Sequence, residues 1–371
     1  MKYTILLSTF LFSLQLAAQT CNTEILLQTP GNWIPRLQGT APVLNAGDLA
    51  REKKIVAALH SMVQSKYTPM GLKAGFLGIY GRIEPNMPGN YFGYSITPLM
   101  FFCERNIIVK EQIRDTYNQF FINANLFDNE IYDTAFEGRS LAEGFNVMSD
   151  LPVYKDGIWL FKEVDQNLGM QTKTTGKKSS WLVTYDNHLP FAYVTKREFL
   201  EKRKKSLAVQ MQQASADIID RLKNIEIEKK YKETEFKNEP VKLEKYMRMD
   251  YREIKKRYEK LLADNLKEFN PAFKKIEDQL KMSPKELSET AIVKIDPTDH
   301  LSYLFTNDDD EFGKILIKPN PGYFNKKLPK SAPQFFFVSV IHRHTEAVSV
   351  KFKDDIVKAI DFSVLKNMLG K

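Results

Sequence analysis

The chain has 371 residues, of which 43% are hydrophobic and 12% aromatic, and its formal net charge is +8. This composition is typical of a globular protein with a packed core and excludes a disordered chain. A mature chain of about 350 residues is long enough for two domains or for one elaborated domain.

The first nineteen residues have the layout of a cleavable export signal. Lys2 supplies the positive charge, residues 5–16 form an apolar stretch, and the small residues Ala17 and Ala18 follow. The stretch is shorter than the roughly 20 apolar residues that cross a bilayer. We therefore predict cleavage after Ala18 or Gln19 and a protein that works outside a bacterial cytoplasm, either periplasmic or secreted. The alternative is a buried N-terminal strand or helix.

The two cysteines, Cys21 and Cys103, bear on both anchoring and redox state. Lipid attachment at Cys21 prefers Gly or Ala directly before it and Leu three residues before it, whereas the chain has Thr20 and Ala18. We therefore favour a soluble mature protein over a lipoprotein. In an oxidising compartment the two thiols can pair, so we expect a disulfide or, failing that, a buried thiol. No later apolar run predicts a transmembrane segment.

Most of the net positive charge comes from one central segment, where residues 196–281 contain 24 Lys and Arg against 17 Asp and Glu. Apolar residues recur there at spacings of three and four, which is typical of amphipathic helices. Two such stripes flank Asn238-Glu239-Pro240, which favours a turn. We predict an antiparallel coiled-coil hairpin with arms of about 60 Å. Its seam residues would be Leu207, Met211, Ala214, Ile218, Leu222, Ile225, Met247, Tyr251, Ile254, Tyr258, Leu262, Leu266, Phe269, Phe273, Ile276 and Leu280.

Two prolines mark the far end of this segment. Asn270-Pro271 predicts a kink, or a stop at which Asn270 caps a new helix. Ser283-Pro284 with Glu286 has the spacing of a capping box, so we expect a short helix after Met282.

The flanks indicate an α+β fold, with one helix from Asp48 to about Tyr67 and strand patterns on both sides of the hairpin. Residues 111–150 fit either helix or strand. We predict four parts: a signal peptide (1–19), the N-terminal part of an α+β body (20–195), the basic hairpin (196–282) and a C-terminal part that completes the body (283–371).

Three segments of the chain resemble a group of hypothetical exported bacterial proteins with a central charged helical hairpin: KYTPMGLKAGFLGIYG, WLVTYDNHLPFAYVTKREFLEKRKK and NPGYFNKKLPKSAPQFF. The resemblance implies export and the same layout. It implies no activity, catalytic residue or cofactor.

Candidate sites are few. His342 and His344 lie two apart on a predicted strand, so they share a face and are weak metal candidates, although more simply they mark the strand's exposed end. The acidic run at 307–311 lacks the ligand spacing of a calcium loop and fits a solvated turn. Tyr323 and Phe324, in a proline-rich loop, either pack beneath it or contact a partner.

The sequence favours a non-enzymatic exported protein that contacts a protein or a cell-envelope component, with no cofactor. The hairpin's interleaved charges fit a solvated surface with weak attraction to an anionic surface rather than nucleic-acid binding. The alternative is a hydrolase of an envelope polymer or peptide with its site in the α+β body.

Overall fold

The computed structural model describes residues 21–36, 45–83, 89–110, 118–126, 145–148, 150–167, 175–298, 301, 303–310 and 312–371. The predicted export signal lies outside these residues, as does most of the undecided segment 111–150. Helices and mostly antiparallel sheets occupy separate stretches of the chain, which confirms the α+β class.

Two compact units share the chain. Unit 1 takes its described residues from 1–126, 162–185 and 327–371, and unit 2 takes them from 127–161 and 186–326. This division differs from the predicted layout, because residues 283–326 belong with the long helices rather than with the front of the chain. The last segment, 327–371, belongs to the same unit as the front of the chain.

Unit 1 is built on a mixed sheet in which the strands follow the order β1-β2-β3-β6-β16-β11, with β10 also paired to β11. The C-terminal strand β16 lies between β6 and β11, where Phe336 is opposite both Ala124 and Val183. All of β16 is buried, as expected of a central strand. The strands are β1 (Asn32–Pro35), β2 (Leu72–Ile83), β3 (Asn90–Met100), β6 (Gln119–Ala124), β10 (Val164–Asn167), β11 (Thr175–Val183) and β16 (Phe336–His342).

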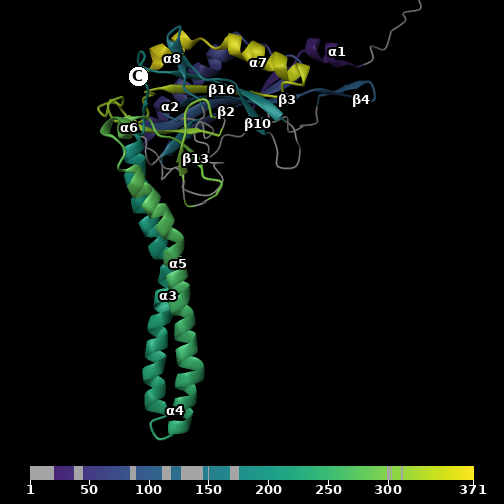
Figure 1. The fold of residues 1–371 in the computed structure, drawn as a ribbon. Coiled ribbons are helices and arrows are strands. Elements are labelled where there is room, and N and C mark those ends of the chain that lie inside the picture. The colour runs from purple at the N-terminus through teal and green to yellow at the C-terminus, as the bar shows by residue number, and fades with distance from the viewer. Residues whose placement is uncertain are drawn as a thin grey trace, which may run out of the picture. The chain divides into compact units, whose positions relative to one another are not determined.

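Four helices of unit 1 pack on this sheet or on one another (Figure 1). They are α1 (Thr23–Gln28), α2 (Ala46–Gln64), α7 (Ala347–Ala359) and α8 (Phe362–Met368). Helix α2 contacts β2 and β3, α7 contacts β16 and α1, and α8 contacts β11. Leu59, Phe92 and Phe120 are completely buried in this layer.

Helix α2 differs from its prediction at both ends. The Asn45 side chain, rather than Asp48, caps it by accepting a 2.8 Å hydrogen bond from the Gly47 amide. Asp48 instead accepts a 2.6 Å hydrogen bond from the Ser331 hydroxyl, 283 residues away. The helix ends at Gln64, three residues before the predicted Tyr67.

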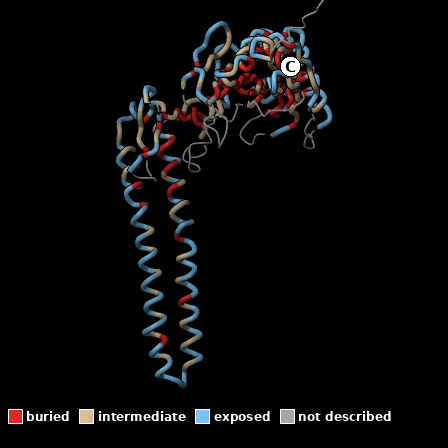
Figure 2. Tube along the Cα trace, turned by 90° about the vertical axis from the view of Figure 1, so that its right-hand side faces the viewer, coloured by how far each residue is buried: buried red, intermediate tan, exposed pale blue. Residues whose placement is uncertain are grey.

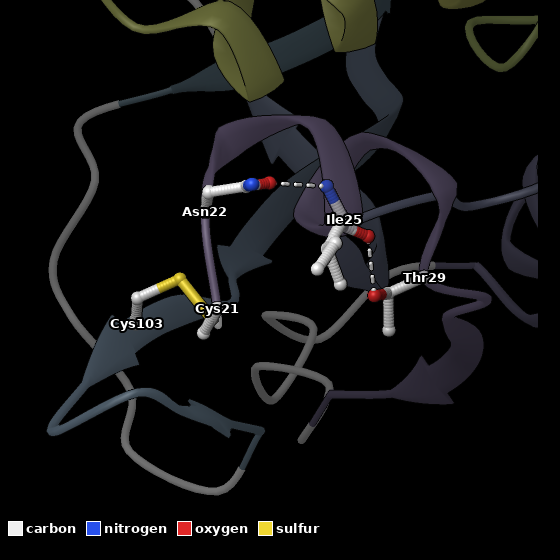
Figure 3. Close-up of a disulfide and its surroundings, with 5 residues drawn as sticks. All are labelled: Cys21, Asn22, Ile25, Thr29 and Cys103. Carbon is white, nitrogen blue, oxygen red and sulfur yellow. Dashed lines mark hydrogen bonds between the residues drawn. A yellow bond between two sulfur atoms is a disulfide. The ribbon is translucent and has the colours of Figure 1, made fainter. Parts of the chain in front are cut away.

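A disulfide joins Cys21, directly before the α1 cap, to Cys103 on strand β4 (Figure 3). This is the pair that the sequence analysis named. Strands β4 (Phe102–Glu104) and β5 (Ile107–Val109) form a separate two-stranded sheet. In α1, the Asn22 side chain accepts from the Ile25 amide and the Thr29 hydroxyl donates to the Ile25 carbonyl.

Unit 2 contains two long helices and a small sheet ordered β12-β15-β13-β14, with β7 also paired to β15. Its helices are α3 (Lys196–Glu235), α4 (Pro240–Tyr246), a π-helical turn η1 (Met247–Tyr251), α5 (Arg252–Gln279) and α6 (Pro284–Ser288). The strands of this sheet are β7 (Asn146–Met148), β12 (Phe191–Tyr193), β13 (Ile292–Ile295), β14 (Tyr303–Phe305) and β15 (Lys314–Pro319). Strands β8 (Val153–Lys155) and β9 (Ile158–Leu160) pair with each other.

One hydrophobic cluster explains why residues 283–326 belong to unit 2. It combines residues at the sheet ends of α3 and α5, including Phe199, Leu207 and Ile276, with Val293 and Leu316 of the small sheet.

The predicted capping box between Ser283 and Glu286 is confirmed at the start of α6.

Of the two outcomes predicted at Asn270-Pro271, a kink or a stop, the stop is wrong. Helix α5 continues through Pro271 to Gln279. Phe269, Ala272 and Ile276 are buried on either side of the proline, and their burial stabilises the helix despite the backbone hydrogen bond that proline cannot donate.

Candidate functional site

Helices α3 and α5 run side by side in opposite directions (Figures 1 and 2). Lys204 pairs with Glu277 at 2.9 Å, Ser215 with Asn265 at 3.3 Å, and Glu226 with Lys255 at 2.6 Å. Each later position on α3 thus contacts an earlier one on α5. We call α3, α4, η1 and α5 together the helix pair.

Helical spacing, rather than apolar character, decides which side chains face inward between these helices. From the end of η1 through α5, the inward positions alternate at spacings of four and three: Tyr251, Lys255, Tyr258, Leu262, Asn265, Phe269, Ala272 and Ile276. Lys255 and Asn265 therefore occupy places for which the sequence analysis named Ile254 and Leu266, and both of those are exposed. On α3, Ser215 is buried and the predicted Ala214 is exposed.

A charged cluster crosses the outer half of the seam. The Glu226 carboxylate accepts hydrogen bonds from the Lys255 ammonium at 2.6 Å and the Tyr251 hydroxyl at 2.8 Å. These two bonds, that from Lys255 above all, lower the pKa of Glu226, and the bond to Glu226 raises the pKa of Lys255. Lys229 also lies 5.3 Å from the centre of the Tyr251 ring. The seam thus contains specific polar contacts that fix which residues face each other.

Towards the turn, the helix pair exposes large apolar side chains. The exposed fractions are 64% for Ile227, 64% for Tyr231, 79% for Val241 and 57% for Met249. Burial in this half is restricted to a few seam residues such as Ile225 and Tyr246, and most of the tube is coloured as exposed (Figure 2). Side chains of this kind give a protein partner apolar surface to bury.

His342 and His344 do not converge with a third metal ligand, and no cluster of three or more His, Cys, Asp or Glu suited to a metal occurs within the described residues. His342 is buried, contrary to the prediction of an exposed strand end, and burial lowers its pKa. Nearby, the Ser179 hydroxyl donates to Glu163 at 2.8 Å.

The acidic run forms a turn that is held by its own neighbours. Asp310 accepts hydrogen bonds from the Lys294 ammonium, the Thr306 hydroxyl and the Phe312 amide. These bonds, with Lys294 the largest cause, lower the pKa of Asp310 to about 2. Asp309 and Asp308 are exposed.

Tyr323 and Phe324 are buried, with ring centres 5.3 Å apart. Of the two roles predicted for them, the structure supports packing beneath the proline-rich loop. Neither side chain is open to a partner.

Glu52 is a buried acid that the sequence analysis missed. Its carboxylate accepts from the Gly81 amide at 2.7 Å and from the Asn90 side chain at 3.0 Å, and burial raises its pKa. The signal was in the sequence, because Glu52 lies three and four residues before Ile55 and Val56 on the apolar face of α2.

Among the helices of the described residues, none has the length and apolar character needed to cross a bilayer. Comparison of the chain with protein-family models, curated proteins and solved structures found no match.

Proposed function

We propose that this is an exported, non-enzymatic binding protein whose helix pair is an inserted coiled-coil hairpin that contacts a protein of the cell envelope. The observation that carries the proposal is the exposure of Ile227, Tyr231, Val241 and Met249 in the half of the helix pair nearest its turn. An extended helical surface of this kind suits a macromolecular partner better than a small substrate, because it offers area rather than an enclosed pocket.

The charges of the helix pair support the same role. Many are satisfied locally, as in the ion pairs Lys232–Glu235 and Lys242–Glu239, so the surplus of positive charge is spread over the surface. Weak attraction to an anionic envelope surface would assist encounter with the partner and would weaken as salt rises. No cofactor is required by this proposal.

The disulfide supports export and a soluble form. Disulfides persist in oxidising compartments and are rare in the cytosol. A lipoprotein cysteine carries its lipid through a thioether bond, so a lipidated Cys21 would have no thiol left to pair with Cys103. The proposed disulfide and a lipid anchor at Cys21 are therefore mutually exclusive.

Photo-crosslinking tests the proposed contact. A benzophenone amino acid would replace Tyr231 or Val241 in the full chain, expressed with its N-terminal segment in bacteria. Phe312 and Val153, which are exposed to 70% and 62% outside the helix pair, are matched control positions. We expect a discrete protein adduct from the helix positions alone. Adducts from the controls only, or from all four positions equally, would contradict the proposal.

Mass spectrometry tests export and anchoring. We expect a mature chain that begins at Gln19 or Thr20, without lipid and lighter by two hydrogen atoms than its reduced form. An uncleaved chain or a lipid on Cys21 would contradict this part of the proposal.

A further inference from the structure

The hairpin of strands β4 and β5 has no core of its own. It pairs with no other strand in the described part of the chain. None of residues 102–110 is buried, and Ile107 is 67% exposed. The base of the hairpin is held by the buried Phe101, whose amide donates a 2.8 Å hydrogen bond to the Gly71 carbonyl. Because isolated two-stranded hairpins are marginally stable in water, the segment beyond Phe101 depends on a further attachment.

The disulfide supplies that attachment. It joins Cys103, in the middle of β4, to Cys21, directly before the α1 cap (Figure 3). Helix α1 is also lightly packed, since Leu26 is the one buried residue among Thr23–Gln28. Elements with few buried residues open at a lower free energy than a packed sheet. The bond is therefore reached without unfolding the central strand β16.

The two linked residues differ in their access to solvent. Cys103 is exposed, whereas Cys21 is half-buried. Glu104, Arg105 and Asn106, which follow Cys103 into the turn, are exposed as well. Thiol–disulfide exchange begins when a thiolate reaches one sulfur of the bond, and exposed disulfides are the labile ones. Access therefore favours attack at Cys103.

We propose that the Cys21–Cys103 bond is a thiol–disulfide exchange site for an exported dithiol protein, and that reduction there releases the β4–β5 hairpin. One thiolate of the partner attacks Cys103 Sγ, which forms a mixed disulfide and expels Cys21 as a thiolate. The partner's second thiolate attacks the partner's own sulfur in the mixed disulfide, and Cys103 leaves as a thiolate. The dithiol ends as a disulfide, having supplied two electrons and the two protons that the leaving thiolates take up. This site lies in unit 1 and does not involve the helix pair.

A trapping experiment identifies the sulfur that is attacked. The oxidised mature chain is mixed with a thioredoxin in which serine replaces the second cysteine of the Cys-X-X-Cys motif, so that the mixed disulfide does not resolve. After acid quenching, peptide mapping should place the thioredoxin on Cys103 and leave Cys21 as the free thiol. An adduct mainly on Cys21, or no adduct, would overturn the proposal.

The rate of reduction by dithiothreitol tests whether the folded chain is the species attacked. Phe120→Ala, in the completely buried sheet layer, should raise the unfolded fraction about a hundredfold or more. Its reduction rate should nevertheless stay within about twofold of the rate for the natural chain, because the sheet does not have to open. Reduction that accelerates in step with the unfolded fraction would show that only the unfolded chain is attacked, and would overturn the proposal.

Amide hydrogen exchange tests the release of the hairpin. After reduction, the amides of β4 and β5 should lose protection and those of β16 should keep it. The double variant Cys21→Ser, Cys103→Ser is the matched control, which should show the same pattern without reductant and no further change with it. Unchanged protection in β4 and β5 would overturn the release. Equal loss in β16 would overturn it too, because the bond would then hold the whole sheet.

Discussion

The sheet layer of unit 1 and the outer half of the helix pair use burial very differently. In unit 1, side chains on strands far apart in the sequence, such as Phe92, Phe120 and Phe337, are completely buried. In the outer half of the helix pair most residues are exposed, and the seam depends on residues such as Ile225 and on polar contacts such as Glu226–Lys255. Burial therefore stabilises the sheet layer of unit 1 most, whereas the outer half of the helix pair leaves surface exposed that a partner could bind.

The largest expected effect is in the sheet. Phe120→Ala should lower the free energy of unfolding by about 3–5 kcal/mol, because it leaves a large cavity in a completely buried layer. Denaturant titration of the purified chain measures the loss. Phe312→Ala, at a residue that is 70% exposed, is the control and should change stability by less than about 0.5 kcal/mol. Equal losses in the two variants would refute the burial argument.

Removing the disulfide should have the next largest effect on unit 1. The bond closes a loop between residues 82 positions apart, so the double variant Cys21→Ser, Cys103→Ser should lose about 2–4 kcal/mol. Thermal unfolding with and without a reductant gives the comparison. Reductant should destabilise the natural chain and leave the double variant unchanged. A reductant effect of the same size on both would show that the bond is not the cause.

A smaller effect is expected in the outer half of the helix pair. Ile225→Ala should cost about 1–2 kcal/mol, below the usual range for a core isoleucine, because the seam residues around it are only half-buried and the site can relax. Ile254→Ala should cost less than about 0.5 kcal/mol, since the side chain points out of the seam. Amide hydrogen exchange in α3 and α5 separates the two. A larger loss of stability for Ile254→Ala than for Ile225→Ala would instead support the seam predicted from the sequence, in which Ile254 faces inward.

The smallest expected effect is on the way the free energy of unfolding changes with pH. Because burial raises the pKa of Glu52, the folded protein holds a proton that the unfolded chain releases. The free energy of unfolding should therefore fall as pH rises from about 4.5 through the raised pKa. Glu52→Gln should remove this part of the pH dependence, as denaturant titrations from pH 4 to pH 8 would show. An unchanged slope would mean that Glu52 is ionised in both states.

Local signals in the sequence predicted local structure well. The two long helices, the turn before Pro240 and the capping box at Ser283 depend on contacts within a few residues, and all three are present. The strand on which the sequence analysis placed His342 is present as β16, because its apolar run is continuous. Helix α7 was missed: it lies directly after β16, and its short alternation of apolar and charged residues was not recognised as helical.

Long-range pairing could not be predicted in the same way. Nothing local to Phe336–His342 says that β6 and β11 will be its neighbours, and nothing local to β13 or β15 assigns them to the base of the long helices. The prediction of the seam residues was wrong for a different reason. The sequence analysis followed apolar residues to Leu266, whereas the phase of the helix places the polar Asn265 inward, opposite Ser215.

The π-helical turn at Met247–Tyr251 has a consequence for how the chain can vary in length. Its closing bond runs from the Arg252 amide to the Met247 carbonyl, so it accommodates one residue more than an α-helical turn. Tyr246 and Tyr251 both face α3 although they lie five positions apart. A related chain that lacked one residue here could close the bulge into regular α-helix and keep every later side chain on the same side. A single-residue deletion should therefore be tolerated better at this turn than within α5.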